Sequence, residues 1–234
     1  MNKTKSILRL AISIALALTF SCSGDDNGGG NSSDCTSSPN GGGNFEYGSL
    51  PYQGKTYKTV KIGNQVWTTE NLNYKVEGSK CYENKDSNCT KYGRLYTWAA
   101  AMGINAKYNE EKWGGSDVKH QGICPDGWHI PSKANWDELI SYVGNSSAGK
   151  HLKARSGWNE CGNGLDTYSF SALPGGIGFS NGDFGYVGDI GIWNSASEYS
   201  SNDAHRKYIR YYSEYVDWGD GYKDYLLSVR CVKD

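Results

Sequence analysis

The chain has 234 residues, of which 21% are charged and 13% are aromatic, and its formal net charge is −1. Because basic residues are scattered and balanced by acids, this composition excludes a nucleic-acid-binding protein that depends on a basic patch. The residues from about 50 onward suffice for one domain with a buried core.

Residues 1–21 have the pattern of a lipoprotein signal peptide. Three basic residues precede the apolar run 10–20, which is too short to span a bilayer comfortably, and small Ser21 precedes Cys22. Thr19 stands where such signals normally have leucine, so an ordinary cleaved signal with an incidental cysteine remains an alternative. We expect Cys22 to be lipidated and to anchor the protein in a bacterial outer membrane. Cleavage before Cys22 removes three basic residues and no acid, which leaves a net charge of −4.

Residues 22–54 are expected to form a flexible tether. Sixteen of the 22 residues from 23 to 44 are Gly, Ser or Asn, a composition that cannot bury apolar surface. Asp25 and Asp26 lie just after the cysteine, and such an acidic pair resembles an export signal that sends lipoproteins to the cell surface in some bacteria. The alternative, that both belong to a solvated linker, stays open.

Residues 57–72 predict a β-hairpin. Apolar residues at 57, 60 and 62 lead to a Gly63-Asn64 turn, and Val66 and Trp67 follow it. Asn71 is polar and comes soon after Trp67. We interpret it as a residue that caps a strand end through side-chain hydrogen bonds.

Two segments have the period of an amphipathic helix. In residues 92–103 the apolar positions are 95, 98, 99 and 102, and in residues 132–143 they are 136, 139, 140 and 143. Ser132 is a suitable N-cap for the second helix, and Gly144 stands just past its end. Two short helices with buried apolar faces are therefore expected.

The last seventy residues contain fourteen aromatic residues and many glycines, without a helical period. Residues 207–215 and 225–232 are predicted strands, and the aspartates at 217, 220 and 224 are assigned to a turn between them. The chain is therefore expected to be α+β, with two short helices and a Gly- and aromatic-rich, mainly antiparallel β region.

Several blocks resemble a known family. Residues 124–143 (CPDGWHIPSKANWDELISYV) are similar to the "GWRLPT-EAEW" helix start of the formylglycine-generating-enzyme and C-type-lectin-like superfamily. The blocks GNQVWTTENL, LPGG, WNSASEY and VRCVKD are more narrowly similar to the Fibrobacter succinogenes major paralogous domain, found in many bacterial surface lipoproteins. The resemblance covers residues 55–234. It implies a C-type-lectin-like fold and a cell-surface location, and it names no ligand.

Seven cysteines fit one lipidated residue and six that form disulfides in an oxidising compartment. Cys81 and Cys89 enclose a short polar loop that a local bridge could close. In C-type-lectin-like folds a cysteine near the first helices bridges to one in the last strand, so the resemblance implies a bond between Cys124 and Cys231. The two cysteines left over, whose pairing rests on elimination alone, are Cys35 and Cys161.

No catalytic, metal or cofactor site is predicted. The four histidines lack metal-ligand spacing, and the sequence has no HExxH, CxxC, GxSxG, P-loop or dinucleotide motif. The formylglycine-generating enzyme uses a pair of reactive cysteines in its late segment, where this chain has only Cys231. Calcium binding is not supported either, since the EPN, QPD and WND triplets of calcium-dependent lectins are missing.

A ligand-binding surface is expected where aromatic residues concentrate. Seven Tyr and Trp residues lie between 208 and 225, and exposed aromatic rings beside polar groups are typical of glycan or protein recognition. The alternative is that tyrosine is simply favoured in strands. We expect a non-catalytic binding or adhesion module, with a formylglycine-generating-type enzyme and a purely structural envelope protein as alternatives. The predicted binding residues are Trp193, Asn194, Tyr212, Trp218 and Tyr222.

Overall fold

The computed structural model describes residues 45–234, which form a mixed α and β structure with mainly antiparallel strands, as predicted. The helices are α1 (Asp86–Tyr92), α2 (Trp98–Met102), α3 (Lys133–Val143) and α4 (Ala148–Leu152), with 3-10 turns at Tyr82–Asn84 and Ala106–Asn109. The strands are β1 (Tyr47–Tyr52), β2 (Lys55–Ile62), β3 (Gln65–Thr68), β4 (Ser79–Lys80), β5 (Leu95–Tyr96), β6 (Trp128–His129), β7 (Gly175–Gly178), β8 (Phe184–Val187), β9 (Ile190–Glu198), β10 (Asp203–Arg210), β11 (Asp217–Tyr222) and β12 (Val232–Lys233).

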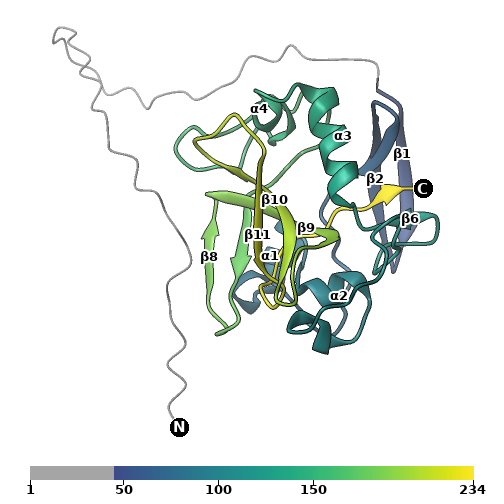
Figure 1. The fold of residues 1–234 in the computed structure, drawn as a ribbon. Coiled ribbons are helices and arrows are strands. Elements are labelled where there is room, and N and C mark those ends of the chain that lie inside the picture. The colour runs from purple at the N-terminus through teal and green to yellow at the C-terminus, as the bar shows by residue number, and fades with distance from the viewer. Residues whose placement is uncertain (1–44) are drawn as a thin grey trace, which may run out of the picture. The chain divides into compact units, whose positions relative to one another are not determined.

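One sheet joins the two ends of the described chain, in the antiparallel order β1-β2-β3-β12-β6 (Figure 1). The predicted β2–β3 hairpin is confirmed, and it turns at Gly63, whose φ of +62° suits a residue without a Cβ. Residues 47–52 correct the predicted extent of the tether. They form β1, which pairs with β2 along its whole length, because the backbone groups of β2 are free to bond an added strand.

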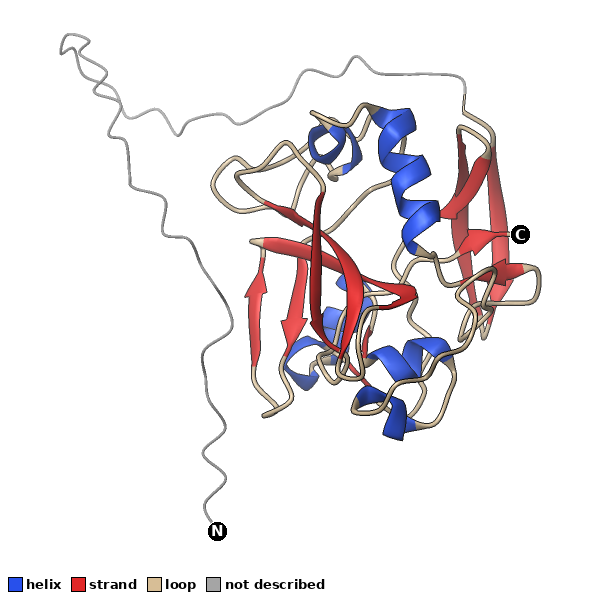
Figure 2. Cartoon of the chain, viewed as in Figure 1, coloured by secondary structure: helices blue, strands red, loops and turns tan. Residues whose placement is uncertain are grey.

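A second sheet, in the order β11-β10-β9, lies at the front of Figures 1 and 2, with the β7–β8 hairpin beside it. Residues 217–222 were predicted to be a turn but form β11, because their backbone groups pair with β10 from Asp203–Tyr222 to Tyr208–Asp217. The predicted strand 207–215 ends at Arg210. Of the predicted strand 225–232, only the last residue belongs to a regular strand.

Helix α3 is confirmed almost residue for residue. Its apolar stripe is buried, and Ser132 caps it in a capping box with Asn135, in which Ser132 Oγ accepts from Asn135 N and Asn135 Oδ1 accepts from Ser132 N. The first predicted helix is only partly correct. It begins at Trp98 rather than 92, because Thr97 is its N-cap, and Leu95 lies in β5 instead.

Helices α1 and α4 were not predicted. They have seven and five residues, too few to carry a recognisable apolar period, and α1 follows directly on a 3-10 turn. The expected count of two helices is therefore wrong. Among residues 45–234, no helix is both long enough and apolar enough to cross a membrane.

The main core lies where α3 packs between the two sheets. Trp67 of the first sheet, Trp136 of α3 and Trp193 of β9 are all buried. Their ring centroids are 4.9 Å (Trp67 to Trp136) and 6.1 Å (Trp136 to Trp193) apart. These tilted ring contacts join three segments far apart in the sequence and pack β9 against α3.

Both disulfides predicted within the described residues are present. Cys124–Cys231 joins the segment before α3 to the segment before β12, across a sequence separation of 107 residues. In the chain-entropy model a loop of that length stabilises the fold by about 4–5 kcal/mol. Cys161 is also disulfide-bonded, and its predicted partner Cys35 lies outside the described residues, as does Cys22.

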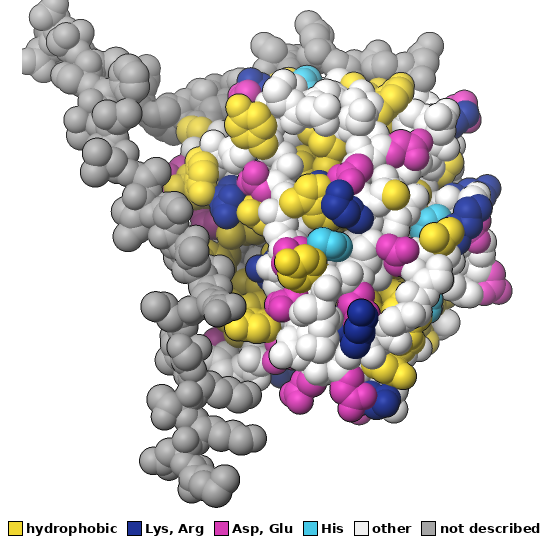
Figure 3. All heavy atoms as spheres, viewed as in Figure 1, with side chains coloured by type: hydrophobic (Ala, Val, Ile, Leu, Met, Phe, Trp, Pro, Cys, Tyr) yellow, Lys and Arg dark blue, Asp and Glu magenta, His cyan; other side chains and the backbone are white. Residues whose placement is uncertain are grey.

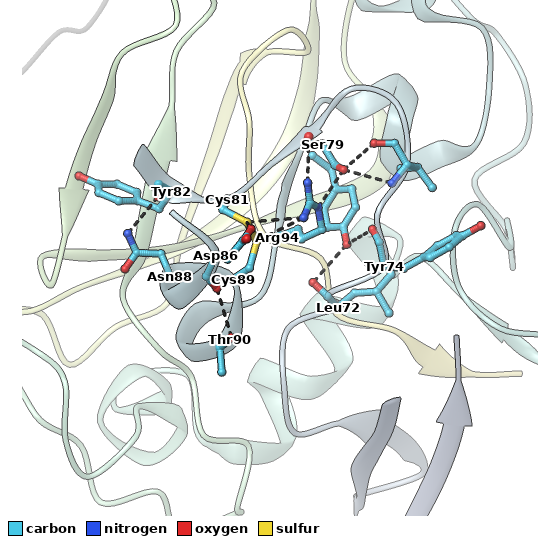
Figure 4. Close-up of a disulfide and its surroundings, with 12 residues drawn as sticks. Leu72, Tyr74, Ser79, Cys81, Tyr82, Asp86, Asn88, Cys89, Thr90 and Arg94 are labelled. Carbon is cyan, nitrogen blue, oxygen red and sulfur yellow. Dashed lines mark hydrogen bonds between the residues drawn. A yellow bond between two sulfur atoms is a disulfide. The ribbon is translucent and has the colours of Figure 1, made fainter. Parts of the chain in front are cut away.

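The second bridge, Cys81–Cys89, fastens α1 to the strand before it (Figure 4). Arg94 points at this bridge, with its Nη1 atom 3.5 Å from each sulfur, and its Nε donates to Ser79 Oγ at 3.0 Å. The guanidinium thus links β4 to the short helix that the disulfide holds in place.

Candidate functional site

Two of the predicted binding residues belong to the core. Trp193 and Asn194 are 1% and 3% exposed, because β9 lies between β10 and the segment around Ser228. Trp193 Nε1 donates to Asn71 Oδ1 at 2.9 Å, and Asn194 Nδ2 donates to the carbonyl oxygen of Tyr96 at 3.1 Å. The prediction that they contact a ligand is wrong, since their polar atoms are used inside the fold.

Asn71 is the centre of this buried network. Its Oδ1 also accepts from Arg230 Nε at 2.7 Å, and its Nδ2 donates to the carbonyl oxygen of Tyr92 at 2.8 Å. Arg230 is fully buried, and burial lowers its pKa to about 9. The other acceptors of its guanidinium are the carbonyl oxygens of Thr68, Phe170 and Ser171. Two residues of the family blocks, Asn71 and Arg230, therefore serve the fold.

The three remaining predicted residues do not form one patch. Trp218 lies opposite Lys207 in the β10–β11 pair, whereas Tyr222 lies opposite Asp203 at one end of it. Tyr212 is 69% exposed and lies in the 211–216 connection at the other end. The hairpin register thus separates these aromatic rings along its length.

Trp218 takes part in a charged cluster that joins the hairpin to α3. Its Nε1 donates to Asp137 Oδ1 at 2.9 Å, and the Nζ atoms of Lys207 and Lys133 lie 3.3 and 4.7 Å from its ring centroid. Lys133 Nζ also pairs with Asp137 Oδ2 at 2.6 Å. We refer to these four residues as the Trp218 cluster.

Ionisation in the Trp218 cluster is set by burial and close opposite charge. Burial lowers the pKa of Lys207 to about 8, against the opposing effect of Asp137. Burial alone would raise the pKa of Asp137, but hydrogen bonds from Lys133 and Trp218 and the charge of Lys207 bring it below its usual value. A lysine with a pKa near 8 has the chemistry of a base or nucleophile, yet Lys207 is only 2% exposed. The cluster therefore serves to hold α3 against the hairpin.

Tyr222 instead begins a chain of rings that reaches the β7–β8 hairpin. Its ring contacts Tyr225 at 5.3 Å, Tyr225 contacts Phe179 at 5.3 Å, and Phe179 contacts Tyr186 at 6.3 Å, all edge to face. Tyr222 and Tyr186, at the two ends, are 44% and 43% exposed. We call these four residues the tyrosine row.

Tyr186 is held in a strained backbone conformation. Its φ is +64°, and it is the only aromatic residue with positive φ among residues 45–234. For a bulky residue this region costs about 1–3 kcal/mol, and burial of its ring does not offset that cost. Because strained backbone residues cluster at functional sites, Tyr186 is a candidate for ligand contact.

Arg206 lies on the same hairpin as Tyr222 and bears on the electrostatics of Tyr225. Its guanidinium occupies the space where a side chain at Gly221 would be, since a Cβ there would lie 2.2 Å from Arg206 Cζ. Within the described residues, Arg206 Nε has no hydrogen-bond partner. Burial raises the pKa of Tyr225, and the charge of Arg206 opposes that effect. The tyrosine row thus combines aromatic edges with a nearby cation.

Figure 3 shows the face over β9–β11, where hydrophobic side chains, tyrosines included, alternate with single acidic, basic and histidine side chains. No patch of one charge dominates this face. Phe179, Tyr186 and Tyr225 were not among the predicted binding residues. The sequence did contain a signal, since the Ser180-to-Asp183 turn forms a hairpin whose two arms bring Phe179 and Tyr186 into contact.

The histidines and the late cysteine show structural contacts. His129 is 2% exposed, with Nδ1 2.6 Å from Asp234 Oδ1 and Nε2 3.3 Å from Asn135 Oδ1. Across residues 45–234, no group of three or more His, Cys, Asp or Glu side chains is placed to hold a metal ion. Cys231 is bonded to Cys124, so it is not a reactive thiol of the formylglycine-generating type.

Comparison with known proteins identifies a family but no individual relative. None of the curated proteins and none of the solved structures matches the chain. The family model of the Fibrobacter succinogenes major domain matches residues 60–233, which include β3, α3, the Asn71 network, the β7–β8 hairpin and the β10–β11 hairpin. Since this match spans most of the chain, the protein belongs to the Fibrobacter succinogenes major domain family.

Proposed function

We propose that this protein is a non-catalytic binding or adhesion module that recognises a glycan or protein ligand through the tyrosine row. The observation that carries this proposal is Tyr186, an exposed aromatic ring held at φ +64° at the end of a row of four rings. Tyrosine offers a large rigid surface and a hydroxyl at little cost in rotamer entropy. The buried guanidinium of Arg206 adds a positive charge beside the row, which acts on Tyr225.

The proposal extends to the fold and to the location of the protein. We assign the domain to the C-type-lectin-like class, supported by the α+β content and by the Cys124–Cys231 bond between the segment before α3 and the end of the chain.

We also propose a lipid anchor at Cys22 and a place on the bacterial outer membrane. Substitution Cys22→Ser should move the protein from the membrane to the soluble fraction, and unchanged partitioning would contradict the anchor.

Binding can be tested with Tyr222→Ala and Tyr186→Ala. Both should weaken capture of the full chain by a printed glycan array and by immobilised mucin, measured with and without calcium. The melting temperature should change little, because neither ring is buried. Tyr142→Ala, on α3 and 57% exposed, is the matched control and should bind as the wild type does.

Two results would contradict this assignment. If Tyr142→Ala weakens capture as much as Tyr222→Ala, exposed tyrosines contribute non-specifically and the row has no special role. If both row variants bind at wild-type strength, recognition lies elsewhere on the surface.

A further inference from the structure

A surface hollow that Asn71 helps to line is a second candidate site. It has a volume of about 250 Å3 and opens between β2, the residues after β3 and the end of α1. Its rim includes Lys55 and Lys58 from β2 and Lys91 from α1, and its lining includes Asn71 and Ser171.

Positive charge is in excess at this hollow. Glu70 is the one acid in the lining, and it already pairs with Lys55, with Nζ and Oε2 2.7 Å apart. Lys58 and Lys91 therefore have no acidic counterpart in the lining. A surplus of two positive charges at one hollow stands out in a chain whose net charge is −1.

The guanidinium of Arg230 is a buried cation that contacts two of the residues lining the hollow. Arg230 donates to Asn71 Oδ1 and to the carbonyl oxygen of Ser171, and both of these residues line the hollow. Each of its hydrogen-bond acceptors is a neutral oxygen, and the charges of Asp166 and Glu70 act on it only in part, since burial still lowers its pKa to about 9. Its positive charge thus adds to the potential inside the hollow, since the guanidinium is removed from water and is screened less than the exposed lysines.

The floor of the hollow is formed by Asn71 and Gly93, which pack closely together. Gly93 has φ +78°, and a Cβ there would lie 2.7 Å from Asn71 Cβ, so only glycine permits this approach. The carbonyl oxygen of Tyr92, at the negative end of α1, is occupied by Asn71 Nδ2 at 2.8 Å. This hydrogen bond satisfies one carbonyl group at the end of α1, where Lys91 supplies a positive charge in the last turn.

We propose that this hollow is an anion-binding site that takes a single sulfate, phosphate or carboxylate group. Its volume is below the roughly 300–1,000 Å3 typical of pockets for drug-sized ligands, so it fits one charged group rather than a whole extended ligand. The group belongs either to a free small anion or to one residue of an anionic glycan. The site is separate from the tyrosine row and does not depend on the function proposed above.

The test uses the full chain, titrated at constant ionic strength with sodium sulfate, sodium phosphate and a heparin hexasaccharide. Backbone amide signals of Thr69, Thr90 and Gly93 should shift and saturate. The double variant Lys58→Gln, Lys91→Gln should weaken binding about tenfold, because two of the charges that face the anion are removed. Glu70→Gln should strengthen it severalfold, since it removes the competing acid.

Lys61→Gln is the matched control, because Lys61 is an exposed lysine on the same strand that pairs with Glu46 away from the hollow. It should leave binding unchanged. Comparable affinity for sulfate and hexasaccharide would identify a free anion as the ligand, and much tighter hexasaccharide binding would identify a glycan-borne group. Either result supports the site. Absence of saturation with all three probes, or equal weakening by Lys61→Gln, would overturn it, and Tyr222→Ala should affect neither outcome.

Discussion

The Asn71 network and the tyrosine row are both rich in aromatic rings, yet they differ in what holds those rings. In the network, Trp193 is 1% exposed and its Nε1 donates to Asn71, which also anchors the buried Arg230. In the row, Tyr222 and Tyr186 touch other rings edge to face and remain almost half exposed. The same residue chemistry therefore supports stability in one region and an accessible surface in the other.

The difference shows that aromatic density alone does not locate a binding surface. A ring whose polar atom meets a buried acceptor is fixed by the fold, as Trp193 is by Asn71. Trp218 is intermediate: its Nε1 is bonded to Asp137, but the ring is only partly buried. The tyrosine row differs from both of these tryptophans because its end rings are exposed and because the backbone of Tyr186 is strained.

The largest expected effect is at Arg230. Arg230→Met should lower the free energy of unfolding by about 3–5 kcal/mol, because it removes the guanidinium donors of three buried carbonyl oxygens and leaves Asn71 Oδ1 with the Trp193 hydrogen bond alone. The melting temperature should fall by roughly 6–20 °C, measured by circular dichroism. Arg155 is exposed, so Arg155→Met is the control and should melt within a few degrees of the wild type. If Arg230→Met lowers the melting temperature no more than Arg155→Met does, the Asn71 network does not stabilise the fold and its contrast with the tyrosine row is lost.

An intermediate effect is expected at the Trp218 cluster, as a dependence on pH. The pKa of Lys207 is about 8 in the folded protein and about 10.4 when unfolded, so the unfolded chain binds more protons between these values. Stability should therefore rise from pH 8 to about 10, by on the order of 1 kcal/mol, in urea denaturation. Lys207→Met should reduce this rise without abolishing it, since burial also lowers the pKa of Lys153 to about 8.

Above pH 10 Tyr96 should oppose this rise, whereas Arg230, whose pKa burial lowers to about 9, should add to it. Burial raises the pKa of Tyr96 well above 10, so the unfolded chain loses that proton first and the contribution of Tyr96 to stability falls. A flat profile from pH 8 to 10 in the wild type would show that Lys207 keeps its ordinary pKa, and the cluster would then resemble a solvated surface pair.

The smallest effect on stability is expected at Tyr186, and its sign is informative. Tyr186→Gly should melt at or above the wild-type temperature, because glycine adopts positive φ without strain, whereas Tyr186→Ala keeps the strain and should be about 1 kcal/mol less stable than the glycine variant. Both variants should lose ligand capture equally. If Tyr186→Gly melts several degrees lower instead, the ring contributes to the core and the row is not a surface feature.

The sequence predicted local structure where a short stretch contains all the interacting groups. The stripe and cap of α3 lie within twelve residues, and the β2–β3 hairpin turns on Gly63, so both were predicted correctly. β11 was missed because its Gly and Asp residues indicate a turn, and only pairing with β10 makes it a strand. The predicted binding set failed at Trp193 for the same reason, since its burial depends on α3 and on Asn71, 122 positions away.

By itself the sequence determined the family, the α+β class, the α3 helix and two of the disulfide pairs, because each depends on motifs or on periodicity along the chain. Only the tertiary structure decided which aromatic residues are exposed and which lysines surround a hollow. Those properties arise when segments far apart in sequence pack together, as Lys55 and Lys91 do around the floor formed by Asn71 and Gly93. Burial and electrostatic potential are sums over such neighbours, and no local pattern in the chain specifies them.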